Sequence, residues 1–185
     1  PIPLDSVEGV NLVTSPAAQL MTGGATVYNQ NTLLLGNFPG PIGATAIAVL
    51  IACAIYLFSR RTASPWITLP FLAVCALCAV MFPRVAGGWK NSVMLELCSG
   101  YLLFAAIFLM TDPVTAPRYW LGRIFYGALG GALTMALRYN GRFEAGACFA
   151  VLIMNAFAPV IDRWSWRMVH GLGTLVKKFR GGAAI

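Results

Sequence analysis

Five apolar runs fill most of the chain after residue 41, at about 42–58, 67–82, 93–111, 122–137 and 146–161. Crossing a hydrocarbon core of about 30 Å takes about 20 helical residues, with about 17 as a lower limit. Unpaired backbone amides are not tolerated against lipid, so each run is predicted to be a helix. With 58% hydrophobic and only 10% charged residues, the chain is too apolar for an ordinary soluble domain. We therefore predict an all-α, polytopic membrane bundle of about five transmembrane helices after an irregular N-terminal segment.

The basic residues are unevenly divided between the two ends of these runs, which predicts an orientation. If the N-terminal segment is outside, nine of the 13 Lys and Arg residues fall on the cytoplasmic side. These nine are Arg60, Arg61, Arg118, Arg123, Arg163, Arg167, Lys177, Lys178 and Arg180. Cytoplasmic segments carry the excess of basic residues in membrane proteins. We therefore expect an extracytoplasmic segment at 1–41, a five-helix membrane domain at 42–162 and a basic cytoplasmic tail at 163–185.

The tail interleaves Trp, Met, Val and Leu with Arg and Lys, so it is interpreted either as a helix on an anionic inner leaflet or as a plain stop-transfer flank. Because the cations lie at the ends of apolar runs, the net charge of +7 does not indicate nucleic-acid binding.

The third run breaks off in FLMTDPVTAP, residues 108–117. Pro113 and Pro117 cannot continue a helix interior, so the helix is predicted to stop here. A carboxylate such as Asp112 near a membrane is costly unless it is paired or faces a cavity. Thr111 and Thr115 supply hydroxyls for a polar ligand or for freed carbonyls. The segment is thus either a simple helix end with a turn or part of a binding site.

The segment TDPVTAP, preceded by YLLFAAIFLM, resembles the signature of the RnfD/NqrB family. This family comprises the D subunit of the Rnf electron-transport complex and the B subunit of the sodium-translocating NADH:quinone oxidoreductase. The stretches LLLGNFPGPIGATAIAVLIACAIYLF and GRIFYGALGGALTMALRYNGRFEAGACFAVLIMNAFAPVID are similar to further family motifs, in the same order. The resemblance covers about residues 33–163 and corresponds to the C-terminal half of family members.

The resemblance implies a multi-pass subunit of the bacterial cytoplasmic membrane. Such a subunit would pass electrons via flavin in an Rnf-like ferredoxin:NAD oxidoreductase and couple them to Na⁺ or H⁺ transport. Its implied partners are the lipid bilayer, other membrane subunits and an N-terminal half of the same protein. The chain is not expected to be catalytic alone, and no catalytic residue or metal site is assigned. A cofactor-free structural or assembly subunit is the alternative, and a small secondary transporter is a weaker one.

In the family, FMN is esterified to a threonine of the extracytoplasmic segment. Here the corresponding frames place Asn11 or Ala17 at the acceptor position, and neither has a hydroxyl. Thr26, in TGGAT, and Thr14 are the leading remaining acceptors, and Ser15 and Thr22 are others. FMN or riboflavin is therefore expected to bind non-covalently, if a flavin is bound at all.

The remaining cofactor candidates lie at the two ends of the helices. At the outer end, Asn37 has neighbouring glycines whose backbone could approach a phosphate. A further departure there is Ala44, where the family usually has Glu. At the inner end, Thr111, Asp112 and Thr115 are the expected flavin environment.

Three further patterns lie within the runs. Glu96 is interpreted as an ion-pathway ligand or as a partner of Lys90 or Arg84. Arg138 and Glu144 are expected to form a salt bridge across an outer turn. Gly127 and Gly131 form a GxxxG motif that predicts close helix packing, and Cys75 and Cys78 are interpreted as packing residues, because thiolates are costly in lipid.

Overall fold

The computed structural model describes residues 30–38, 40, 43–84, 89–140 and 146–181, together with Pro16 and Leu20. Side chains are described for these residues except at 30–32 and 170–181. Every regular element in this part of the chain is helical, which confirms the all-α prediction. The helices are α2 (Gln30–Leu35), α3 (Ile47–Ser59), α4 (Pro65–Met81), α5 (Trp89–Cys98), α6 (Leu102–Phe104), η2 (Ala105–Leu109), α7 (Trp120–Asn140) and α8 (Gly146–Gly181).

Each of the five apolar runs contains at least one helix, and α2 adds a short helix to the segment that was predicted to be irregular. One helix, at Gly146–Val169, is both long and apolar enough to cross a membrane among the described residues. The bent pair Trp89–Cys98 and Leu102–Leu109 passes the same test as a single broken span. At about 1.5 Å per residue, the 13 residues of α3 rise only about 20 Å. Five crossings therefore stay a prediction.

The sequence predicted one helix for the third run, but the structure divides this run into two parts. Its two halves, α5 and α6–η2, are bent by 65° relative to each other. Gly100, with φ of 65°, lies between them in a conformation that few other residues adopt. After the bend the chain forms the π-helix η2, in which the amide of Met110 bonds the carbonyl of Ala105. The Thr68 hydroxyl of α4 donates to the Ala106 carbonyl at 3.1 Å and so links α4 to η2.

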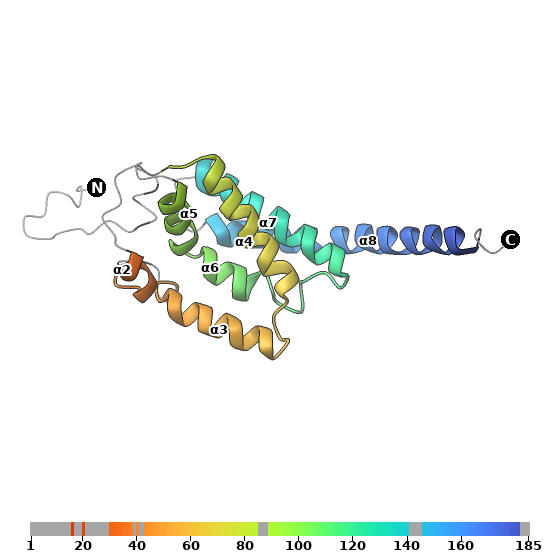
Figure 1. The fold of residues 1–185 in the computed structure, drawn as a ribbon, viewed down its shortest axis with the longest axis horizontal. Helices are drawn as coiled ribbons and strands as arrows, with labels where there is room; N and C mark the ends of the chain where they lie inside the picture. The colour runs from red at the N-terminus through yellow and green to blue at the C-terminus, as the bar shows by residue number, and fades with distance from the viewer. Residues whose placement is uncertain are drawn as a thin grey trace, which may run out of the picture.

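Among the described helices, α4 and α7 share the most extensive contact, and they lie alongside each other in Figure 1. A Cβ atom added at Gly127 would lie 2.3 Å from the Ile67 carbonyl oxygen, and one at Gly131 would lie 2.7 Å from that of Phe71. The two backbones can approach this closely only because both positions are glycine, which confirms the packing prediction from GxxxG. Cys75 is fully buried in the same contact, where its Sγ lies 3.7 Å from the Gly131 carbonyl oxygen.

Helix α8 packs against α7 in its first half and then extends beyond the other helices (Figure 1). It runs for 36 residues, through Pro159 and through the predicted domain boundary at residue 162. Pro159 has no amide hydrogen, so the carbonyl of Asn155 loses its usual intrahelical donor. The apolar first half and the basic second half therefore belong to one continuous helix.

Candidate functional site

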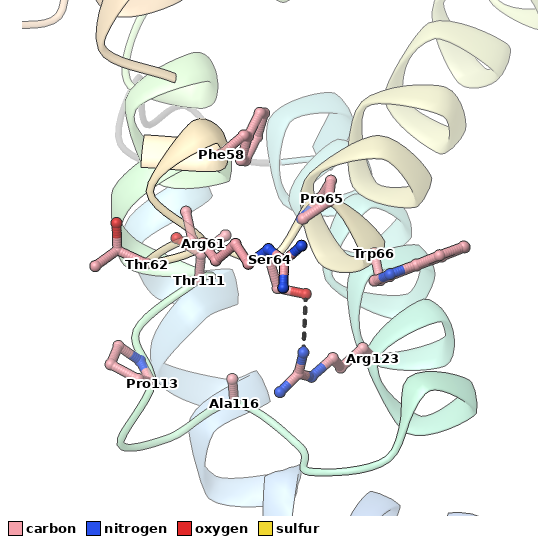
Figure 2. Close-up of a pocket in the computed structure, with 11 residues that line it drawn as sticks. Phe58, Arg61, Thr62, Ser64, Pro65, Trp66, Thr111, Pro113, Ala116 and Arg123 are labelled. Carbon is pink, nitrogen blue, oxygen red and sulfur yellow. Dashed lines mark hydrogen bonds between the residues drawn. The ribbon is translucent and has the colours of Figure 1, made fainter. Parts of the chain in front are cut away.

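The helix-ending segment after η2 forms one wall of a cavity of about 480 Å³. Helix η2 ends at Leu109, as the prolines predicted, and the chain then turns through residues 111–118. The cavity lies between this turn, the α3–α4 connection and the start of α7 (Figure 2). Its lining includes Phe58, Arg61, Thr62, Ser64, Pro65, Trp66, Thr111, Pro113, Ala116 and Arg123, and we call it the inner cavity.

Arg123 holds the three walls of the inner cavity together. Its Nε donates to the Pro117 carbonyl at 2.9 Å, and its Nη1 donates to the Ser64 hydroxyl at 3.2 Å. Figure 2 shows the guanidinium group reaching from α7 toward the connection that precedes α4. The sequence reasoning counted Arg123 only as a cytoplasmic charge. The position of Arg123, six residues after Pro117, could have indicated that its side chain donates to a free carbonyl of the turn.

Arg61 is the second basic residue of this cavity and has an unusual backbone. Its backbone φ is 56°, and among the described residues no other non-glycine residue has a positive φ. Such conformations are uncommon for non-glycine residues and recur at binding sites. The conformation ends α3 and directs the chain back toward α4, so that Arg61 and Arg123 line the same space.

The three residues predicted at the inner site do not share one wall. Thr111 is buried, lines the inner cavity and donates its hydroxyl to the Ile107 carbonyl. Asp112 accepts the Val114 amide at 3.2 Å, so its carboxylate shapes the turn. Thr115 faces a separate cavity of about 360 Å³ between the turn and α8.

Thr115 has a buried hydroxyl oxygen without a hydrogen bond among the described residues. It lies near the Tyr126 hydroxyl, but that group donates to Asn155 Oδ1 at 2.6 Å. A buried hydroxyl without a partner is costly and is expected to find a donor or acceptor in a ligand or water.

The outer candidates are only partly described. Asn37 is exposed in the turn after α2 and is not among the residues that line the inner cavity. Gly36 beside it has φ of 76°, and a Cβ there would lie 2.6 Å from the Thr45 carbonyl oxygen, so packing already requires this glycine. Thr14 and Thr26 lie outside the described residues.

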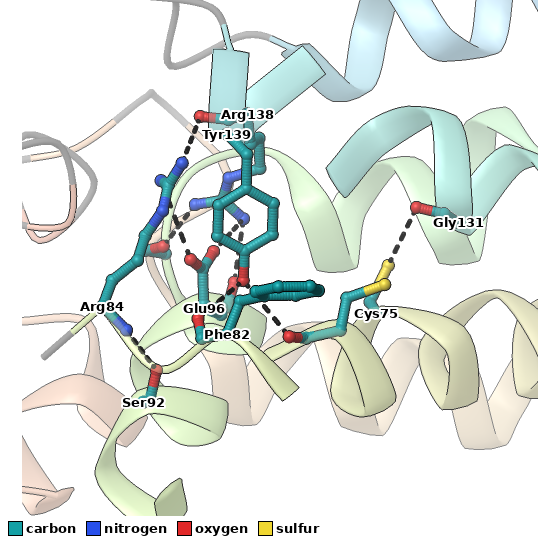
Figure 3. Close-up of polar contacts among 10 residues, drawn as sticks. Cys75, Phe82, Arg84, Ser92, Glu96, Gly131, Arg138 and Tyr139 are labelled. Carbon is teal, nitrogen blue, oxygen red and sulfur yellow. Dashed lines mark hydrogen bonds and ion pairs between the residues drawn. The ribbon is translucent and has the colours of Figure 1, made fainter. Parts of the chain in front are cut away.

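Glu96 lies at the predicted outer ends of the helices in a buried ionic cluster (Figure 3). Its carboxylate is fully buried, 3.4 Å from Arg138 Nη1 and 3.9 Å from Arg84 Nη1. Arg138 also donates to the Glu96 carbonyl at 2.9 Å and to the Ser99 hydroxyl at 2.6 Å. Arg84 donates to the Arg138 carbonyl at 2.9 Å, and its guanidinium carbon lies 3.9 Å from the centre of the Tyr139 ring.

This cluster decides between the partners that the sequence left open for Glu96. Pairing with Arg84 is confirmed, whereas Lys90 lies over the Trp89 ring. Arg138, which was expected to pair with Glu144, pairs with Glu96, and Glu144 is outside the described residues. Two guanidinium groups against one carboxylate leave a net positive charge in the cluster. A cation bound at Glu96 would therefore have to displace an arginine.

Comparison with known proteins agrees with the resemblance in the sequence. A model of the NQR2, RnfD, RnfE family matches residues 2–171. The chain belongs to this family. The D subunit of the ion-translocating oxidoreductase complex of Stutzerimonas stutzeri is 35% identical over 151 residues, which cover 80% of this chain and 41% of that protein. The protein of the same name from Halorhodospira halophila is 32% identical over 78% of this chain and 40% of its own length.

A further family relative is the D subunit of the proton-translocating ferredoxin:NAD(+) oxidoreductase complex of Clostridium ljungdahlii. It is 29% identical over 75% of this chain and 42% of that protein. The chain thus spans about two fifths of the length of the curated relatives it matches.

Proposed function

We propose that this chain is part of the D-type membrane subunit of an ion-translocating redox complex in the bacterial cytoplasmic membrane. The observation that carries the proposal is the family match over residues 2–171, together with relatives named as subunits of ion-translocating oxidoreductase complexes. In this proposal the other subunits of the complex are the partners, and electron flow through flavin is coupled to movement of Na⁺ or H⁺. The N-terminal segment is extracytoplasmic and the C-terminus cytoplasmic.

The inner cavity is the proposed flavin site, because its lining combines apolar surface with hydrogen-bond donors. Phe58 and Trp66 offer aromatic surface to a planar ring system. Ser64 offers its hydroxyl to a polar ring edge or to a ribityl chain, and Thr62 offers an acceptor, because its own hydroxyl donates to the Leu57 carbonyl at 3.2 Å. Pro70 within α4 lacks the amide that would bond the Trp66 carbonyl, so an acceptor is left at the cavity wall.

The cavity residues also set the electrostatics of the proposed site. Arg61 and Arg123 place two positive charges around one space, which favours the uptake of an electron by any group bound there. Arg123 is held by Pro117 and Ser64 and so acts as a positioning residue. A flavin, when bound, supplies the one-electron and two-electron chemistry, while the protein supplies binding and orientation.

The test is the flavin content of the purified complex carrying Arg61→Gln, with Arg60→Gln as the matched control. Both residues are exposed neighbours at the end of α3, but only Arg61 lines the inner cavity. We expect acid-extractable flavin to fall about tenfold with Arg61→Gln, because a charge-assisted hydrogen bond is lost, and to be unchanged with Arg60→Gln. Equal flavin content in the two variants would exclude this cavity as the site.

The alternative is a cofactor-free structural subunit of the same complex. It is favoured by Asn11 and Ala17, which lack the hydroxyl needed for a phosphoester. A fluorescent flavin band after denaturing electrophoresis would indicate covalent attachment at a remaining hydroxyl such as Thr26 or Thr14. Acid-extractable flavin would indicate a non-covalent cofactor. A complex in which this subunit carries neither form would support the structural role.

Glu96 stays a proposed ion-pathway residue. In this role its release from Arg84 or Arg138 would accompany ion binding, because both arginines lie within 4 Å of its carboxylate. The test is the sodium-dependent or proton-dependent turnover of the complex with Glu96→Gln, measured together with the stability of that complex. Turnover that is lost while the complex stays folded would support a role in ion transport, and loss of both would indicate a structural role.

A further inference from the structure

A second basic cavity lies at the other side of the turn, between the segment that leads into α7 and the middle of α8. Its volume is about 500 Å³. Arg118 and Tyr119 line it from one side, and Asp162, Arg163, Trp166 and Arg167 line it from α8. The Arg118 amide donates to Asp162 Oδ1 at 3.0 Å, so the two walls are joined. We call it the α8 basic pocket.

The charges of the α8 basic pocket favour an anion. Three arginines face one carboxylate, which gives a net charge of about +2. The side chains of Arg118, Arg163 and Arg167 are exposed, and none forms an ion pair with another described residue. Arg163 and Arg167 are four residues apart on one helical face, where like charges destabilise the helix. A bound phosphate group would remove this repulsion and match the planar donors of arginine.

The position of the pocket indicates where this phosphate comes from. Arg163 and Arg167 fall within the last two turns of the apolar helix Gly146–Val169. Trp164 and Trp166 beside them are 43% and 49% exposed. Tryptophan at the end of an apolar helix is typical of the membrane–water interface. The pocket therefore lies at headgroup depth if α8 crosses the bilayer, a condition that rests on the proposed function.

We propose that the α8 basic pocket binds the phosphate headgroup of an anionic phospholipid of the cytoplasmic leaflet. The arginines bind the headgroup, and the Trp166 and Pro159 side of the pocket gives the acyl chains apolar surface along α8. A bound lipid would tie α8 to the turn that also forms the inner cavity, because Arg118 directly follows Pro117 in that turn.

The test is lipid retention by the intact purified complex, measured by mass spectrometry after exchange into vesicle-derived nanodiscs of mixed phosphatidylglycerol and phosphatidylcholine. Arg167→Gln and Arg118→Gln remove one charge from each wall of the pocket. Arg60→Gln removes one exposed charge from the same predicted membrane side, outside the pocket. We expect retained phosphatidylglycerol to fall about tenfold in the first two variants and to be unchanged in the third.

Three results would overturn the proposal. Equal retention in all variants would remove the pocket as the site. Displacement of the lipid by inorganic phosphate at comparable concentration would point to a phosphate site without lipid selectivity. Loss of another subunit from the Arg167→Gln complex, with lipid unchanged, would point to a protein contact. Flavin content is measured on the same samples to separate the lipid proposal from the proposed redox function. A complex that lacks flavin but still retains phosphatidylglycerol selectively would contradict the redox function and leave the lipid site intact.

Discussion

Replacing Gly127 with alanine tests the close approach of α4 and α7. The added Cβ would lie 2.3 Å from the Ile67 carbonyl oxygen, whereas ordinary contact begins at 3.4 Å. The atom it meets is backbone, so no side chain can rotate away, and α4 must shift by about 1.1 Å. An increase of about 0.5–1 Å in the separation of two packed atoms already removes about a quarter to a half of their dispersion energy. We therefore expect a destabilisation of about 1–3 kcal/mol, as in other overpacked cores.

Gly130→Ala is the matched control on the same helix. Its Cβ would lie 2.4 Å from the Met110 Cε, which is the far end of a flexible side chain. Both changes gain about the same helix propensity, roughly 1 kcal/mol, so this gain cancels in the comparison. The two variants should thus differ by about 2 kcal/mol, the middle of the range expected for overpacking.

The assay is the temperature at which each purified variant loses its monodisperse peak in detergent. A difference of about 2 kcal/mol corresponds to about 4–8 °C for a chain of this size, with Gly127→Ala the less stable. Equal temperatures for the two variants would refute the argument that backbone contact fixes the spacing of α4 and α7.

Three further predictions concern the cluster, the π-helix and the orientation. Glu96→Gln should lower the stability of the protein by about 3–5 kcal/mol, because Arg138 is then buried without a counter-charge. Replacing both Glu96 and Arg138 by apolar residues should recover much of this loss in the same thermal assay. Thr68→Val should cost about 1 kcal/mol, because it removes the hydroxyl that bonds the η2 backbone, and unchanged stability would contradict this role. In a cysteine-free background, Lys90→Cys should react with an impermeant maleimide on intact cells and Arg60→Cys only after lysis, and the reverse pattern would invert the proposed topology.

The helical content could be predicted because apolar runs in a membrane protein have few other ways to satisfy their backbone. The GxxxG contact was predictable for a similar reason, since Gly127 and Gly131 are one turn apart and leave a groove on one face. The bend at Gly100 was not predicted, because a single glycine within an apolar run is as compatible with a straight helix as with a break. The continuity of α8 was also missed, because a change from apolar to basic composition does not require the helix to end.

The candidate site was predicted in part. The sequence located the turn at Asp112 but not the residues that meet it from other helices, such as Arg61 and Arg123. Hydrophobic periodicity says which face of a helix is buried but not which loop lies opposite. The pairing of Arg138 with Glu96 was not predicted for the same reason, because only folding brings the two residues together, and the expected salt bridge with Glu144 lies outside the described residues.

The unbroken course of α8 has a mechanical consequence. Thirty-six residues at about 1.5 Å each make a rod of about 54 Å, which packs in the bundle as far as the buried Ser165 and then extends beyond the other helices (Figure 1). A tilt of only about 5° around its buried end would carry the far end of a rod of this length sideways by about 5 Å. A small displacement among the packed helices would therefore produce a larger displacement at the far end of α8. Pro159, which removes one intrahelical hydrogen bond, is a position where the helix could bend instead.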